Sequence, residues 1–102
     1  MGIQFRNNGT VKEIDSLPDV THLEVTFVSR DRDSISGQIW SHDADGENMF
    51  VGTFSLDAEG KMFLYPDDED GWPESSKLEI ISSFNLSDIT DLQLLRLAAE
   101  AF

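Results

Sequence analysis

The sequence predicts an α+β fold, with a curved antiparallel sheet of about six to seven strands in meander order and one C-terminal helix packed on it. Two observations support this prediction. Short runs of alternating apolar and polar residues are separated by turns rich in Gly, Asn and Asp, which is typical of consecutive antiparallel strands. The end of the chain instead carries apolar residues at helical spacing. With 102 residues, we expect one acidic binding domain spanning residues 1–102.

An Asn-Gly pair predicts the first hairpin. Residues 3–6 and 10–14 flank Asn7-Asn8-Gly9, and Asn-Gly favours the positive φ angles of a tight turn. The third strand alternates apolar and polar residues. We expect its apolar residues, Leu23, Val25 and Phe27, to share one half-buried face.

Four more strands follow at short intervals. Ile35, Gly37 and Ile39 alternate with polar residues and Trp40 in the fourth strand. After a turn carrying Asp45-Gly46, the fifth strand is expected to place Phe50, Phe54 and Leu56 on one face, with Gly52 between them marking a bend. The last two strands are expected over residues 61–65 and near residues 77–83.

Helical spacing appears only at the end of the chain. Ser87-Asp88 is the predicted helix cap, and the residues that recur at helical spacing are Ile89, Leu92, Leu95, Ala99 and Phe102. Leu94, Leu97 and Ala98 widen this apolar surface beyond one stripe. The helix therefore either packs deeply on the sheet or shares a face with a second subunit, which would make the protein a homodimer.

The net charge restricts the kinds of partner. Twenty acidic residues against seven basic ones give a formal charge of -13. Such a charge repels nucleic-acid phosphates and anionic lipids, so we expect no direct binding to nucleic acid or to a membrane. A basic protein would instead be attracted and steered to the surface.

Neighbouring strands running up and down would collect most of the acids at one end of the sheet. That end would hold Asp15, Asp19 and the turns at residues 43–47 and 67–74, with Lys77 as the only base close by. Mutual repulsion there would be relieved by a cationic surface. The residues predicted to bind the partner are Asp43, Asp45, Glu47, Asp67, Asp68, Glu69, Asp70, Trp72 and Glu74.

Trp72 stands inside the most acidic segment, YPDDEDGWPE. An exposed tryptophan ringed by carboxylates would anchor an interface, because interface hot spots are rich in tryptophan and have polar rims. The alternative is that the ring packs back onto the core, since tryptophan is on average highly buried. The sequence leaves both alternatives open.

No motif in the sequence indicates catalysis, a cofactor or a metal. Ser41-His42-Asp43 are sequence neighbours, which does not supply the spatial relay that a nucleophile and base require. Aligning Gly46 or Gly71 with the glycine of a calcium loop puts Gly52 at the twelfth position or Pro66 at the first, so both matches fail. We therefore expect a protein that is not an enzyme and holds neither a cofactor nor a metal ion.

In size, acidity and lack of catalytic motifs, the chain is similar to bacterial immunity proteins and to phage-encoded inhibitors that mimic the charge of DNA. This similarity implies a small acidic inhibitor that occludes a basic protein, with an immunity protein against a nuclease-type toxin as the first hypothesis. The alternatives are a DNA-mimic anti-defence inhibitor or an assembly subunit joined through the C-terminal helix. The absence of cysteine and of long apolar runs indicates the cytoplasm.

Overall fold

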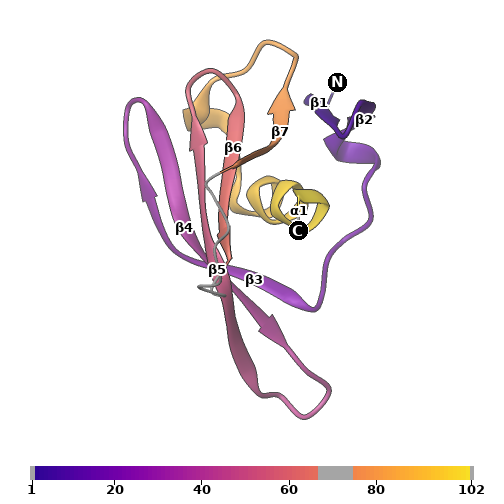
Figure 1. The fold of residues 1–102 in the computed structure, drawn as a ribbon, viewed down its shortest axis with the longest axis vertical. Coiled ribbons are helices and arrows are strands. Elements are labelled where there is room, and N and C mark those ends of the chain that lie inside the picture. Colours follow the sequence, from indigo (N-terminus) through magenta and orange to yellow (C-terminus); the bar gives the residue numbers. More distant parts are fainter. Residues whose placement is uncertain (1, 67–74, 102) are drawn as a thin grey trace.

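A computed structural model describes residues 2–66 and 75–101, and it confirms the predicted fold class. Seven antiparallel strands form one sheet, and one C-terminal helix packs against it (Figure 1). The strands are β1 (Gln4–Asn7), β2 (Thr10–Glu13), β3 (Leu23–Arg30), β4 (Ser34–His42), β5 (Asn48–Asp57), β6 (Lys61–Pro66) and β7 (Ser75–Ile80). The helices are α1 (Asp91–Ala101) and two short 3-10 turns, η1 (Ile14–Ser16) and η2 (Leu86–Asp88).

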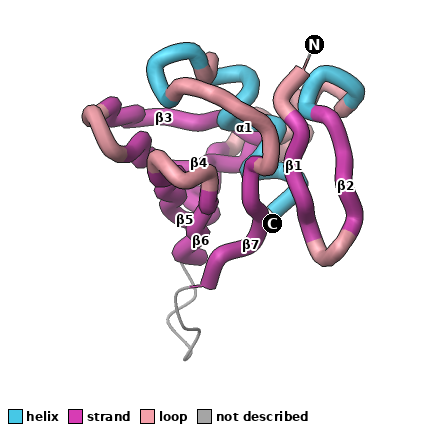
Figure 2. Tube along the Cα trace, turned by 90° about the horizontal axis from the view of Figure 1, so that it is seen from above, coloured by secondary structure: helices cyan, strands magenta, loops and turns pink. Residues whose placement is uncertain are grey.

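The strand order is β2-β1-β7-β6-β5-β4-β3, so consecutive strands are neighbours from β3 to β7. The meander breaks between β2 and β3, which lie at opposite edges of the sheet. The N-terminal hairpin pairs instead with β7, through Phe5 opposite Ile80 and Asn7 opposite Leu78. Figure 2 shows this hairpin on the far side of β7 from β6. The expectation that all consecutive strands are neighbours is therefore wrong at this one connection.

Alternation along the central strands builds the core. Every second residue of β5 from Gly52 to Leu56 is buried, and Ile35 and Ile39 are the buried residues of β4. The sheet curves around α1, so these side chains and the helix share one interior (Figure 1). The buried apolar residues are Phe5, Ile14, Ile35, Ile39, Phe54, Leu56, Met62, Leu64, Leu78, Ile80, Ile89, Leu94, Leu97 and Ala98.

The helix begins at a cap that differs from the predicted one. The Thr90 hydroxyl accepts a hydrogen bond from the Gln93 backbone N–H at 3.1 Å, and the Gln93 side chain accepts one from the Thr90 backbone N–H at 3.0 Å. This reciprocal pair is a capping box. Ser87 and Asp88 belong instead to η2, one turn earlier. No helix in the described part of the chain is long and apolar enough to cross a membrane.

The helix buries its second apolar stripe. Leu94, Leu97 and Ala98 are fully enclosed, whereas Leu92 from the first predicted stripe is 46% exposed. Residues 94, 97, 98 and 101 follow the i, i+3, i+4, i+7 spacing of a single helix face. Phe102 lies outside the described residues. Leu94, Leu97 and Ala98, which widen the predicted apolar surface of the helix, thus pack in the protein's own core.

Ion pairs fix the helix between distant strands. Lys12 Nζ in β2 lies 2.9 Å from Glu100 Oε2, and the Asn7 side chain donates to the Glu100 backbone carbonyl at 2.8 Å. At the other end of the helix, the Arg30 guanidinium lies 2.7 Å from Asp91 Oδ1 and donates to the Ile89 carbonyl. The helix therefore contacts both edge strands of the sheet, β2 and β3, and these contacts orient its buried face.

Two register shifts change which residues face the core. Between Thr26 and Ser29, β3 carries an extra residue, and Phe27 adopts φ +51°. Phe27 is consequently 78% exposed, and Val28 packs on the core instead. A second shift at Val51 turns Phe50 to the outer face opposite Trp40. The expected burial of Phe27 with Leu23 and Val25, and of Phe50 with Phe54 and Leu56, is therefore wrong.

Two hairpin turns share one construction. In both Asp43-Ala44-Asp45-Gly46 and Asp57-Ala58-Glu59-Gly60, the first aspartate accepts two backbone N–H groups through Oδ1, and the glycine has positive φ. The aspartate oxygen satisfies donors that the tight turn leaves unpaired, and glycine adopts this φ without steric cost.

We expect Asp57→Ala to lower the free energy of unfolding by about 1–2 kcal/mol, because two backbone N–H groups lose their acceptor. Asp57→Asn keeps an Oδ1 acceptor and should stay within about 0.5 kcal/mol of wild type. Urea denaturation of both variants checks this. An equal loss of unfolding free energy in the two variants would show that the charge of Asp57, and not its hydrogen bonds, stabilises the turn.

Candidate partner-binding site

The acidic turn, defined here as Asp43, Asp45 and Glu47, lies at the tip of the β4–β5 hairpin. All three residues are exposed. The Asp43 carboxylate accepts the backbone N–H groups of Asp45 and Glu47 at 2.9 and 2.8 Å, which holds the turn in one shape. The three carboxylates are therefore presented together on a hydrogen-bonded loop at one extremity of the molecule (Figure 1).

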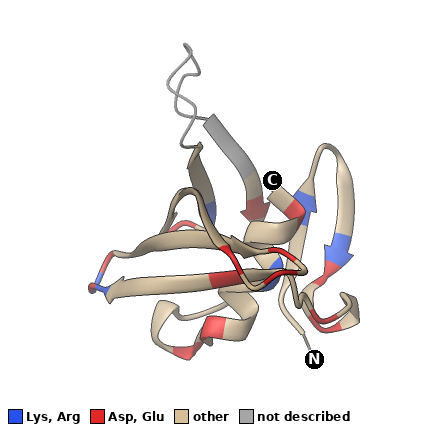
Figure 3. Cartoon of the chain, turned by 90° about the horizontal axis from the view of Figure 1, so that it is seen from below, with Lys and Arg blue, Asp and Glu red and all other residues tan. Residues whose placement is uncertain are grey.

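Four of the described Lys and Arg side chains pair with acids elsewhere in the fold; Figure 3 colours the basic residues blue and the acidic ones red. The ion pairs made by Lys and Arg join Lys12 to Glu100, Arg30 to Asp91, Arg96 to Asp19 and, more distantly, Lys61 to Glu59. Within the described ranges, no ion pair reaches the acidic turn. Its negative charge is therefore left to solvent or to a partner.

The predicted acidic end of the sheet is smaller than expected. Asp15 follows the last strand residue of β2, Glu13, which is opposite Gln4. Gln4 lies beside the C-terminal end of β7. Asp15 is therefore at the end of the sheet opposite to the acidic turn. Asp19 pairs with Arg96 at 2.5 Å. Asp15 leaves the predicted cluster because β1 joins the sheet at β7, and the charge of Asp19 is paired within the fold. The remaining predicted residues, Asp67, Asp68, Glu69, Asp70, Trp72 and Glu74, lie outside the described part of the chain.

His42 is held at the base of the acidic turn. Its Nδ1 lies 2.5 Å from Asn48 Oδ1 across the hairpin, and its Nε2 lies 2.9 Å from Glu24 Oε2 on β3. The Asp43 carboxylate bonds to its own turn rather than to His42. His42 thus links three strands beneath the acidic turn. The described residues contain no group of three His, Asp or Glu side chains arranged to hold a metal ion.

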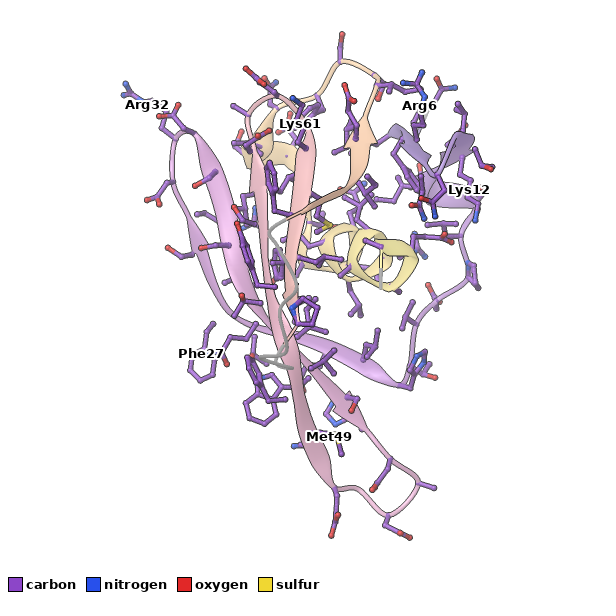
Figure 4. All side chains as sticks on the ribbon, viewed as in Figure 1. Arg6, Lys12, Phe27, Arg32, Met49 and Lys61 are labelled. Carbon is purple, nitrogen blue, oxygen red and sulfur yellow. The ribbon has the colours of Figure 1, made fainter. Side chains whose placement is uncertain are left out.

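Aromatic side chains lie on the outer face of the sheet next to this hairpin. We define the aromatic face as Phe27, Trp40 and Phe50, on β3, β4 and β5. The Trp40 and Phe50 rings meet at 5.4 Å between centroids, tilted by 58°. Figure 4 shows Phe27 pointing away from α1. Trp40 and Phe50 are half-buried, and neither packs on the core.

Sequence reasoning missed the aromatic face because two register shifts create it. A signal was nevertheless present for one residue: Trp40 stands at a polar position of the alternating fourth strand, next to buried Ile39. An aromatic residue at an outward position of a sheet with only one covered face indicates a surface patch.

Two open hollows lie at the opposite end of the molecule, on either side of Phe84. One is lined by Arg30, Asp31, Arg32 and Ser87, and the other by Ser83, Asp88 and Gln93. Arg30 in the first hollow is already paired with Asp91. The first hollow mixes both charges, whereas Asp88 is the one charged residue among the described residues that line the second.

Comparisons of the chain with protein-family models, curated proteins and solved structures give no match.

Proposed function

We propose that this protein is a small acidic inhibitor that binds and occludes one basic protein partner, with the acidic turn as part of the contact surface. One observation carries the proposal: Asp43, Asp45 and Glu47 are exposed together on an ordered turn that no ion pair of the described residues reaches, while four of the described Lys and Arg side chains pair with acids elsewhere in the fold. Because the backbone of the turn is already held by hydrogen bonds to Asp43, little backbone entropy is lost when a cationic surface docks against it.

The mechanism is steric and electrostatic. The net charge of -13 accelerates encounter with a basic groove, and the acidic turn then pairs with Lys or Arg side chains that otherwise hold an anionic substrate. The partner's own site is thereby covered, and no bond is made or broken. A cation-lined groove of this kind is typical of proteins that bind nucleic-acid phosphates.

We further propose an immunity protein acting in the cytoplasm against a nuclease-type toxin. A toxin that cleaves nucleic acid presents the basic groove that this mechanism requires. A protein without cysteine has no disulfide that would call for an oxidising compartment.

The test compares the wild type with a triple variant carrying Asp43→Asn, Asp45→Asn and Glu47→Gln, as bait in lysate of the source organism. Asn at position 43 keeps the oxygen that accepts the turn's two N–H groups, so the fold should be retained. We expect the wild type to capture a basic protein, and the triple variant to bind that purified protein on the order of tenfold more weakly at low salt.

A matched control removes three charges at the other end of the sheet, with Asp31→Asn, Asp33→Asn and Glu59→Gln. It should bind nearly as well as wild type. Equal weakening by the two triple variants would show that only total charge matters, and would contradict a contact at the acidic turn. Inhibition of the partner's activity at a one-to-one ratio, relieved by salt, is the functional readout.

A further inference from the structure

Phe27 is the most anomalous residue of the described chain. A bulky side chain at φ +51° is a backbone outlier that costs free energy, and its ring is 78% exposed. Phenylalanine at this position therefore stabilises the fold neither through a favourable backbone conformation nor through burial in the core. Such strain at a surface position is characteristic of functional sites.

The aromatic face continues from Phe27 across three strands. Thr26, next to Phe27, is opposite Gln38, and the Gln38 side chain accepts a hydrogen bond from Trp40 Nε1 at 3.1 Å. Trp40 in turn contacts Phe50 on β5. Neighbouring strands are about 4.8 Å apart, so the face is roughly 10 Å wide. The hydrogen bond and the ring contact restrain Trp40 before any partner binds.

Carboxylates border the aromatic face. Glu24 is directly opposite Trp40 in the register, and its side chain is half exposed even while paired with His42. The acidic turn begins three residues after Trp40, about 10 Å along the strand. A second copy of this chain, with the same charge of -13, would be repelled from such a border, whereas a cationic protein would be attracted.

Aromatic rings beside carboxylates favour one kind of cation. The planar guanidinium of arginine stacks on aromatic rings and bonds carboxylates with two parallel N–H groups, whereas the ammonium of lysine is a strongly hydrated point charge. We propose that the aromatic face, bordered by Glu24 and the acidic turn, receives arginine side chains of the basic partner. This inference rests on the proposed function and specifies the partner's contact chemistry.

The experiment uses two synthetic peptides of equal charge as probes, six Arg-Gly repeats and six Lys-Gly repeats, titrated calorimetrically into the full protein. We expect the arginine peptide to bind roughly fivefold more tightly than the lysine peptide. Phe27→Asn should remove most of this preference. Since Asn tolerates positive φ, the melting temperature of this variant should be no lower than that of wild type.

Val11→Asn is the matched control, because Val11 is also an exposed apolar residue, 52% accessible, but lies on β2 at the other edge of the sheet. It should leave both affinities unchanged. Equal affinity for the two peptides, or no effect of Phe27→Asn, would overturn the inference. So would a wild-type dimer in sedimentation that Phe27→Asn converts to a monomer, since the face would then bind a second copy.

The acidic-turn triple variant separates this inference from the proposed function. Suppose that the wild type binds the two peptides equally and that the triple variant binds both more weakly. The acidic turn then attracts cations as proposed, and the aromatic face has no role. If the triple variant binds both peptides as well as wild type does, the proposed role of the acidic turn fails, whatever the arginine preference.

Discussion

Leu97→Asp is expected to unfold the protein. Leu97 is fully enclosed between the helix and the sheet, so the substitution removes a buried apolar side chain and places an unpaired carboxylate in the core. Together these changes cost more than about 5 kcal/mol, which is comparable with the whole stability of a domain of this size. Circular dichroism should show loss of the cooperative thermal transition.

Leu92→Asp is the matched control on the same helix, because Leu92 is 46% exposed. Its melting temperature should fall by only a few degrees. A folded Leu97→Asp variant that changed from dimer to monomer in sedimentation would contradict the buried position. It would support instead the assembly subunit joined through the C-terminal helix.

Gly52→Ala is expected to be the second most damaging change. A Cβ atom at residue 52 would lie 2.5 Å from the Tyr65 backbone carbonyl oxygen and 2.9 Å from Pro66 Cα. Both atoms are backbone, so relief requires β5 and β6 to move apart. We expect a loss of about 3 kcal/mol, seen as a fall in melting temperature of about 15 °C.

Gly46→Ala provides the comparison for this prediction. Gly46 has φ +81° but open space around its Cβ position, so the substitution should cost only the backbone strain, about 1 kcal/mol. Similar losses at positions 46 and 52 would show that the close approach of β5 and β6 relaxes at little cost. Thermal denaturation of the two variants side by side decides between these outcomes.

Local sequence signals were sufficient for most of the fold. The Asn8-Gly9 turn, the Gly46 and Gly60 turns and the alternation around Ile39 and Phe54 predict the strands, since each depends on neighbours in the chain. The Thr90 to Gln93 capping box was also readable, although Ser87-Asp88 offered a competing cap. The pairing of β1 with β7 could not be read locally, because it joins residues more than 70 positions apart.

The candidate site was predictable only in part. Exposure of Asp43, Asp45 and Glu47 follows from a turn rich in Asp and Gly, and the structure agrees. The aromatic face depends on the extra residues in β3 and β5, whose positions are determined by the partner strand rather than by composition. A shift of one residue moves a side chain to the other face, and this placed Phe27 and Phe50 on the outer face of the sheet.

The pairing of β1 with β7 also has a consequence for synthesis on the ribosome. The β1–β2 hairpin is synthesised before its sheet neighbour at residues 75–80 and before Glu100, the ion-pair partner of Lys12. Phe5 therefore has no complete core to enter until β7 and α1 have been made. Such dependence on distant contacts slows folding and lengthens the time for which apolar strands stay unprotected in the nascent chain. The high negative charge keeps nascent chains apart during that interval.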